Sequence, residues 1–140
     1  MGNIATPRRT AVIGGVAAAV LAAGIPFAAM TPASASGSSG GVEKEGRCSD
    51  GRARYNFEVE REDGGFKADF RVRDARPGRE WRVKLFHDGD RFYNRVRTVN
   101  GDGEIEVERR RPNTGGADRF HARARNLGTG ALCAVTITRS

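Results

Sequence analysis

Apolar and polar residues alternate along most of the chain beyond residue 50, with a period of two. In residues 66–73 apolar side chains fall at every second position, and residues 80–87 repeat the pattern around Trp81, the only tryptophan. A period of two with one apolar side is typical of a half-buried β-strand. We therefore predict that these two segments form strands that anchor the hydrophobic core.

The same pattern, interrupted by turn residues, predicts seven short strands. Pairs such as Asp88-Gly89 are typical of hairpin turns. The predicted strands are residues 52–61, 66–73, 80–87, 91–99, 104–109, 118–125 and 131–138. No segment beyond residue 35 shows a helical period. Seven strands spaced about ten residues apart predict an all-β domain, either an antiparallel β-sandwich or, as the alternative, a small antiparallel barrel.

The segment Asp118–Ala124, with the sequence DRFHARA, resembles the F strand of immunoglobulin-like and fibronectin type III-like domains. Trp81 fits the immunoglobulin-like pattern as well. Phe120 lacks the hydroxyl group of a tyrosine corner, and residues 66–73 and 118–125 contain no cysteine for the usual bridge between sheets. The longer stretch DRFHARARNLGTGALC, which ends at Cys133, is similar to small secreted actinobacterial proteins of unknown function.

This resemblance implies a seven-stranded antiparallel immunoglobulin-like β-sandwich. Its two sheets would contain the first, second and fifth strands, and the fourth, third, sixth and seventh strands, in those orders. It implies no activity, because a fold by itself does not determine a function.

Residues 1–35 have the features of a signal peptide. Two adjacent arginines precede an apolar run at residues 11–24, and a small-residue cleavage site ends at Ala35. An uncleaved membrane anchor is the alternative, because residues 11–30 are nearly long enough to span a bilayer. The predicted organisation is a signal peptide at 1–35, a flexible Ser/Gly-rich linker at 36–46 and a β-sandwich domain at 47–140.

Export gives the two cysteines a structural meaning. Cys48 and Cys133 lie near opposite ends of the predicted domain, so we expect one disulfide bond in an oxidising compartment. Two cysteines are too few for a tetrahedral metal shell. The chain has 24 basic and 17 acidic residues, a balance that favours anionic partners. We expect a secreted protein, either free outside the cell or associated with its envelope.

No catalytic constellation stands out in the sequence, and we expect neither an enzyme nor a cofactor or metal. His87 at a turn and His121 on an outward position are expected to be surface residues. Asp88, Asp90 and Asp102 could bind calcium only if their two turns met in space, and their spacing does not match an EF-hand loop. The serines have no histidine partner at a recognisable spacing.

Charged residues sort by strand face. On residues 52–61, 66–73 and 104–109 the outward acids and bases should neutralise each other across neighbouring strands. On the other sheet the outward positions bring together bases and aromatic rings without acids. The orientation of residues 91–99 depends on whether Phe92 or Tyr93 points inward. The predicted binding face consists of Arg82, Lys84, Tyr93, Arg95, Arg97, Arg119, His121, Arg123 and Arg125.

Two functions from different classes follow. The first is a secreted non-catalytic binding module whose basic face binds an anionic polymer or a cell-envelope surface. The same face could instead serve only solubility. The second is a secreted accessory or inhibitor-like protein that docks on a partner protein through its end loops, where the basic segment Arg109–Pro112 would project and could enter a protease cleft. Steep salt dependence would favour the first function, and dependence on one or two loop residues the second.

Overall fold

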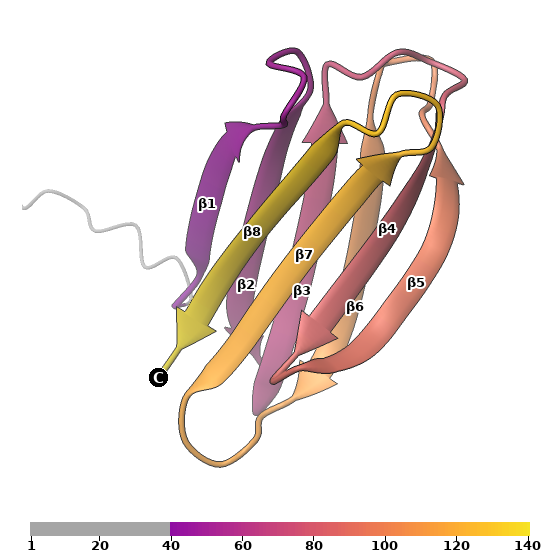
Figure 1. Ribbon diagram of the computed structural model, residues 1–140. Coiled ribbons are helices and arrows are strands. Elements are labelled where there is room, and N and C mark those ends of the chain that lie inside the picture. Colours follow the sequence, from indigo (N-terminus) through magenta and orange to yellow (C-terminus); the bar gives the residue numbers. More distant parts are fainter. Residues whose placement is uncertain (1–39) are drawn as a thin grey trace, which may run out of the picture. The chain divides into compact units, whose positions relative to one another are not determined.

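Two antiparallel sheets make up the part of the chain that the computed structural model describes, residues 40–140 (Figure 1). The first sheet has the order β1-β2-β3-β6, with β1 at Val42–Arg47, β2 at Arg54–Glu62, β3 at Gly65–Arg73 and β6 at Ile105–Pro112. The second has the order β5-β4-β7-β8, with β4 at Glu80–His87, β5 at Asp90–Thr98, β7 at Asp118–Asn126 and β8 at Leu132–Arg139. The predicted signal peptide lies outside the described residues.

The predicted all-β class and the assignment of strands to two sheets are confirmed, but the domain has eight strands instead of seven. The additional strand β1 lies mostly within the predicted linker at 36–46 and pairs with β2, where Val42 lies opposite Val59. Its sequence VEKEGR has a single strongly apolar residue, so no alternation marked it as a strand. Its position comes from pairing with β2 and from packing at Gly46, where an added Cβ would collide with the Tyr55 ring.

The core lies between the sheets and consists mainly of the alternating apolar residues of the strands; Tyr93, predicted to face outward, belongs to it as well. Trp81 is 1% exposed, and Phe57, Phe70 and Phe120 are completely buried. Within the first sheet, Phe57 and Phe70 meet edge to face with ring centroids 5.8 Å apart. Phe66 meets Phe120 of the other sheet in the same way, with centroids 5.2 Å apart. These contacts join β2 to β3 and β3 to β7, so the aromatic residues connect both layers.

One side of the sandwich is closed by covalent and polar contacts that β8 makes with β1 and with the connection between β1 and β2. The predicted disulfide between Cys48 and Cys133 is present, and it joins residues separated by 85 positions in the sequence. Beside it, the Ser49 amide donates to the Leu132 carbonyl over 2.8 Å, and the Ser49 side chain accepts from the Leu132 amide. Farther along, the Lys44 ammonium donates to the Thr136 carbonyl. Within residues 40–140, no helix is long and apolar enough to cross a membrane.

The predicted orientation of residues 91–99 is wrong, and a β-bulge explains why. Leu85 pairs with Tyr93 and Phe86 pairs with Arg91, so Phe92 is an extra residue in β5 without a partner of its own. Phe92 and Tyr93 therefore do not compete for one inward site. Both rings contact β6 arginines, and the alternation is shifted by one residue beyond the bulge. Tyr93 is buried, and Arg95 and Arg97 lie opposite core residues of β4.

The end of β6 also differs from the prediction. The strand continues to Pro112, so Arg109–Pro112 belong to the sheet and not to a projecting loop. Their partners are residues 65–68 of β3. The basic segment that would have carried docking through an end loop is thereby fixed along the edge of the first sheet.

Candidate functional site

The outer face of the β5-β4-β7-β8 sheet gathers the basic residues that alternate with the core. Register places Arg82 directly opposite Arg125, and Lys84 directly opposite Arg123. We call this surface the basic face, and it consists of Arg82, Lys84, Arg91, Arg119, Arg123 and Arg125. Like charges directly opposite each other destabilise a sheet, so this arrangement carries an energetic cost.

Most of the predicted binding residues lie on this face, and three do not. Arg82, Lys84, Arg119, His121, Arg123 and Arg125 occupy the expected outward positions. Tyr93, Arg95 and Arg97 lie on the opposite side of β5 because of the bulge, while Arg91 pairs with Phe86 and joins the basic face. Glu80, at the first position of β4, is the one acid among the outward strand positions of this sheet.

The outer face of the other sheet has a balanced set of charges. Its cross-strand ion pairs, as expected from the sequence, are Lys67–Glu60 at 2.9 Å, Arg71–Glu106 at 2.8 Å, Arg73–Glu104 at 3.8 Å and Arg110–Glu62 at 3.1 Å. Arg71 also pairs with Asp69 of its own strand. By contrast, no ion pair within residues 40–140 involves a base of the basic face. The two outer faces therefore use their arginines differently.

Two hollows lie on the basic face and share Arg123. The first, of about 290 Å³, is lined by Phe86, Gly89, Arg119, His121, Arg123 and Thr136. The second, of about 380 Å³, is lined by Arg82, Lys84, Arg123, Arg125, Leu127 and Leu132. Because one arginine contributes to both hollows, a single extended ligand could occupy the two in succession.

His121 lines the first hollow with an uncharged ring next to the ring of Phe86. Its ring lies 5.8 Å from that of Phe86, and its Nδ1 atom is 2.9 Å from the Thr136 hydroxyl. Burial, and then the charge of Arg123, lower the pKa of His121 below its ordinary value of 6.5. The ring is therefore neutral at neutral pH, so the positive charge in this hollow comes from Arg119 and Arg123.

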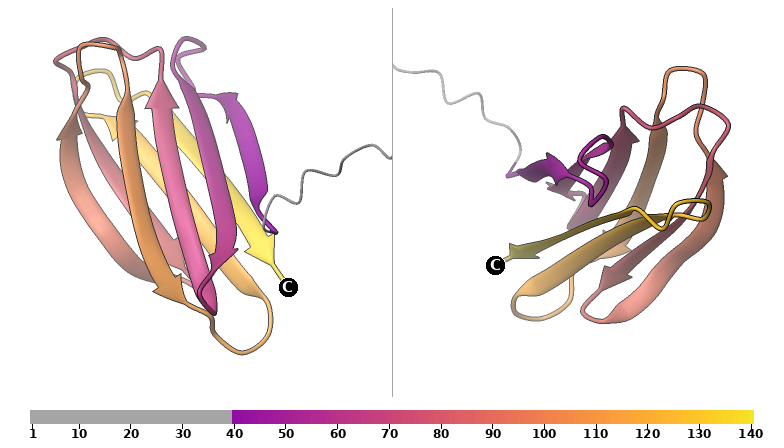
Figure 2. Two further views of the ribbon diagram at one scale, coloured as in Figure 1. Left: turned by 180° about the vertical axis from the view of Figure 1, so that it is seen from behind. Right: turned by 45° about the horizontal axis from the view of Figure 1, so that its top comes forward.

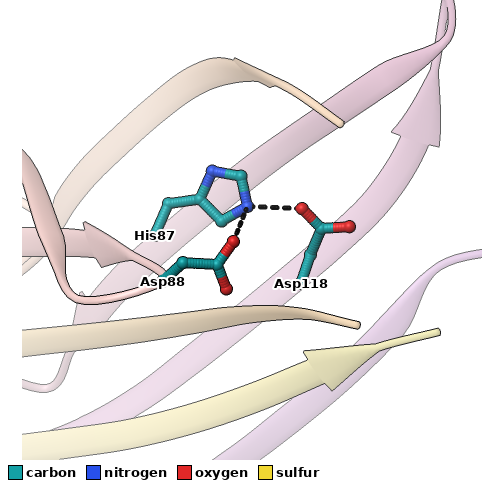
Figure 3. A group of neighbouring side chains, drawn as sticks. All are labelled: His87, Asp88 and Asp118. Atoms are coloured by element: carbon teal, nitrogen blue, oxygen red, sulfur yellow. Dashed lines mark hydrogen bonds and ion pairs between the residues drawn. The ribbon is translucent and has the colours of Figure 1, made fainter. Parts of the chain in front are cut away.

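A second polar cluster lies at the turn between β4 and β5, where His87, Asp88 and Asp118 meet (Figure 3). The expected surface position of His87 is wrong, because the residue is only 2% exposed. Its ring stacks on Phe120 with centroids 4.3 Å apart and planes 7° apart. The sequence contained a signal for this burial, since His87 continues the inward series of β4 two residues beyond Leu85.

Hydrogen bonds occupy the converging atoms of this cluster. His87 Nε2 lies 2.7 Å from Asp118 Oδ1 and 3.4 Å from Asp88 Oδ2. The Thr114 hydroxyl lies 2.7 Å from a carboxylate oxygen of each aspartate, and its amide donates to Asp118. The Arg119 amide donates to Asp88 over 2.7 Å. A nitrogen and two carboxylate oxygens could ligate a divalent cation, but here they connect the β4–β5 turn to the segment before β7.

The calcium arrangement considered from the sequence does not form. Asp88 precedes β5 and Asp102 follows it, so their turns lie at opposite ends of that strand. The Asp102 amide donates to the side chain of Asn100 within its own turn. Asp88 is held by Thr114 and Arg119 at the other end.

The cluster of His87, Asp88 and Asp118 should make the stability of the folded state sensitive to acid. Burial alone would raise the pKa of Asp118, but hydrogen bonds from Thr114 and His87 outweigh it and lower that pKa. The Arg119 amide and then the Thr114 hydroxyl lower the pKa of Asp88 as well. The folded state thus favours the ionised carboxylates, and their contribution to stability, present above about pH 4, is lost as the pH falls through the folded-state values.

We expect Asp118→Asn to lower the free energy of unfolding at neutral pH by about 1–3 kcal/mol, since a buried network loses its charged acceptor. The variant should also lose less stability than the parent chain between about pH 5 and pH 2. Urea unfolding across this range would measure both effects. Burial raises the pKa of Asp69, so this carboxyl group has the opposite effect on how stability changes with pH. Both proteins contain Asp69, so it does not affect the difference between their pH profiles. Parallel pH profiles for the two proteins would contradict the prediction.

Comparison with known proteins found no relative: no protein-family model, no curated protein and no solved structure matches the chain.

Proposed function

We propose that this protein is a secreted, non-catalytic binding module whose basic face binds an anionic polymer or an anionic cell-envelope surface. The observation that carries the proposal is the contrast between the two outer faces. One pairs its arginines with acids, and the other places Lys84 opposite Arg123 with no ion pair to either within residues 40–140. Bound anionic groups would relieve that repulsion and supply the missing partners.

The form of the ligand follows from the hollows. Several bases spread over β4 and β7 could contact successive charges of one chain, and Arg123 belongs to both hollows. Such contacts fix the position of a polyanion without reading a sequence. The Phe86 and His121 rings are one tilted pair, with 43° between their planes. They do not form the series of stacking platforms that single-stranded nucleic acids commonly use. We therefore favour an acidic polymer that has no nucleobases.

We also infer an immunoglobulin-like or fibronectin type III-like topology and a cleaved signal peptide. Sheets of the order β1-β2-β3-β6 and β5-β4-β7-β8 support the first inference. The disulfide is consistent with an extracellular protein and supports the second.

The test is a triple charge reversal on the basic face, Arg82→Glu with Arg123→Glu and Arg125→Glu. We expect binding to polyphosphate at near-physiological salt to weaken by more than about tenfold, because three phosphate contacts become repulsive. The parent chain should also show a steep salt dependence that the variant loses. Thermal unfolding should change little, because these side chains make no ion pairs within residues 40–140.

A matched control reverses the same amount of charge elsewhere. Arg52, Arg76 and Arg79 are exposed loop residues around a different hollow, so their replacement by glutamate changes the net charge equally. The control should bind polyphosphate more tightly than the face variant. Equal losses in both triple variants would show that net charge alone causes binding and that the basic face has no special role.

A further inference from the structure

Four arginines gather at the side of the sandwich opposite the disulfide, on the inward positions of two edge strands. Arg95 and Arg97 of β5 lie opposite the core residues Val83 and Trp81. Arg109 and Arg111 of β6 lie opposite Ala68 and Phe66. We call these four residues the edge cluster. In the described part of the chain β5 pairs only with β4 and β6 only with β3, and both strands lie on the same side of the domain (Figure 2).

Contacts with Phe92 and Tyr93 hold three of the four guanidinium groups of the edge cluster in place, whereas Arg95 donates to the Asn94 carbonyl. The Arg109 guanidinium lies 4.7 Å from the centroid of the Tyr93 ring, and that of Arg111 lies 5.0 Å from Phe92. Arg97 donates to the Tyr93 hydroxyl over 3.2 Å. A guanidinium stacked on a ring keeps the N–H groups of its edge available for a carboxylate. These contacts therefore prepare the cluster for anionic groups before any ligand arrives.

The cluster has no anionic partner in residues 40–140. None of its four arginines takes part in an ion pair there, and the Nε atom of Arg111 is buried without a hydrogen-bond acceptor. Buried charged donors usually have partners, because an unsatisfied one costs free energy. Charge complementarity thus points to carboxylates or similar groups from outside the domain.

The outward side of β5 has a different chemistry. Beyond the bulge its residues Asn94, Val96 and Thr98 carry no charge, and Val96 is one of two large apolar side chains that are clearly exposed within residues 40–140, at 39%. The outward side of β6 instead carries Glu106, Glu108 and Arg110. A strand added along β5 would meet arginines on one side and a small apolar surface on the other. A strand added along β6 would instead meet charges of both signs on its outward side.

We propose that the free edge of β5 binds an extended acidic segment of a partner protein, which adds to the β5-β4-β7-β8 sheet as a further strand. Main-chain hydrogen bonds to β5 supply affinity, and side-chain alternation supplies specificity. Acidic side chains at every second position lie against the edge cluster, and the intervening apolar side chains lie beside Val96. A second copy of this chain does not fit the site, because pairing β5 with β5 would bring the arginines of the two copies together.

Synthetic peptides provide the test. A ten-residue peptide of alternating glutamate and valine should bind the full chain, as measured by isothermal titration calorimetry. A peptide of the same composition with five glutamates followed by five valines should bind at least about tenfold more weakly, because only alternation matches the two sides of β5. An alternating lysine–valine peptide should not bind.

Variants locate the site. Arg95→Glu with Arg97→Glu should weaken binding of the alternating peptide by at least about tenfold, since attraction becomes repulsion. Both side chains are exposed, so thermal unfolding should confirm that the variant is folded. The matched control, Arg52→Glu with Arg76→Glu, carries the same charge change on exposed loop residues outside both proposed surfaces and should keep the affinity within about twofold.

Three results would overturn the proposal. Equal binding of the block peptide would exclude strand addition, and equal losses in the two double variants would reduce the effect to net charge. Absence of binding by the parent chain, together with dimerisation of an Arg95→Val, Arg97→Val variant, would mean that the arginines only protect an exposed edge from self-association. These outcomes are independent of polyphosphate binding, because the basic face is tested with other residues and another ligand.

Discussion

Replacing Trp81 with alanine is expected to lower the free energy of unfolding by about 3–5 kcal/mol, a large share of the stability of a small domain. Trp81 is the largest of the fully buried side chains and lies in β4, between β5 and β7. Its removal leaves a cavity that the surrounding close-packed residues can fill only in part. Urea unfolding followed by far-ultraviolet circular dichroism measures the change.

Two further variants separate packing from other effects of the Trp81 substitution. Trp81→Phe should cost less than Trp81→Ala, because the ring volume is mostly kept and the indole N–H, buried here without an acceptor, is removed. Leu127→Ala, at a side chain that is 48% exposed, should change stability by no more than about 0.5 kcal/mol. Long-wavelength tryptophan fluorescence that a soluble quencher fully suppresses would contradict the buried position of Trp81.

Loss of the disulfide should have an effect of similar size. The bond between Cys48 and Cys133 spans a separation of 85 residues, and closing so long a loop restricts the unfolded chain strongly. The chain-entropy account gives about 4 kcal/mol for the Cys48→Ala, Cys133→Ala variant. Denaturant unfolding of the variant and of the oxidised parent chain measures this difference.

The parent chain under reducing conditions is the natural control, because it loses the same constraint without a substitution. The reduced parent and the double variant should unfold at similar urea concentrations, both well below that of the oxidised parent. Two free thiols in the mass spectrum of the unreduced protein would contradict the bond. Equal stability of the oxidised parent and the variant would contradict its role in stabilising the domain.

The bulge at Phe92 divides the arginines of β5 between two surfaces. Arg91 lies before the bulge and faces outward with Phe86. Arg95 and Arg97 lie after the bulge, on the inward side of β5, and belong to the edge cluster. One predicted basic surface thereby becomes two, which we propose to bind an acidic polymer and an acidic peptide respectively. A bulge shifts every following side chain to the other face of the sheet.

The amino-acid sequence by itself determined the strands that have a clear period of two, together with the residues that they bury. Trp81, Phe70 and Phe120 could be placed in the core because burial of alternate apolar side chains is the dominant local requirement of a strand. The assignment of strands to sheets and the pairing of the two cysteines were also correct. The outward arginines of β4 and β7 followed from the same alternation.

Only the tertiary structure decided the features that depend on a neighbouring strand. β1 has too few apolar residues to be recognised and is ordered by its pairing with β2. The bulge at Phe92 allows two adjacent aromatic rings both to contact arginines of β6, a strand that lies close only in the folded chain. His87 can be buried because Asp118, which Thr114 in turn contacts, approaches from another segment and provides a partner for the His87 ring nitrogen. Alternation reports what one strand buries, whereas register and polar pairing depend on contacts between segments far apart in the sequence.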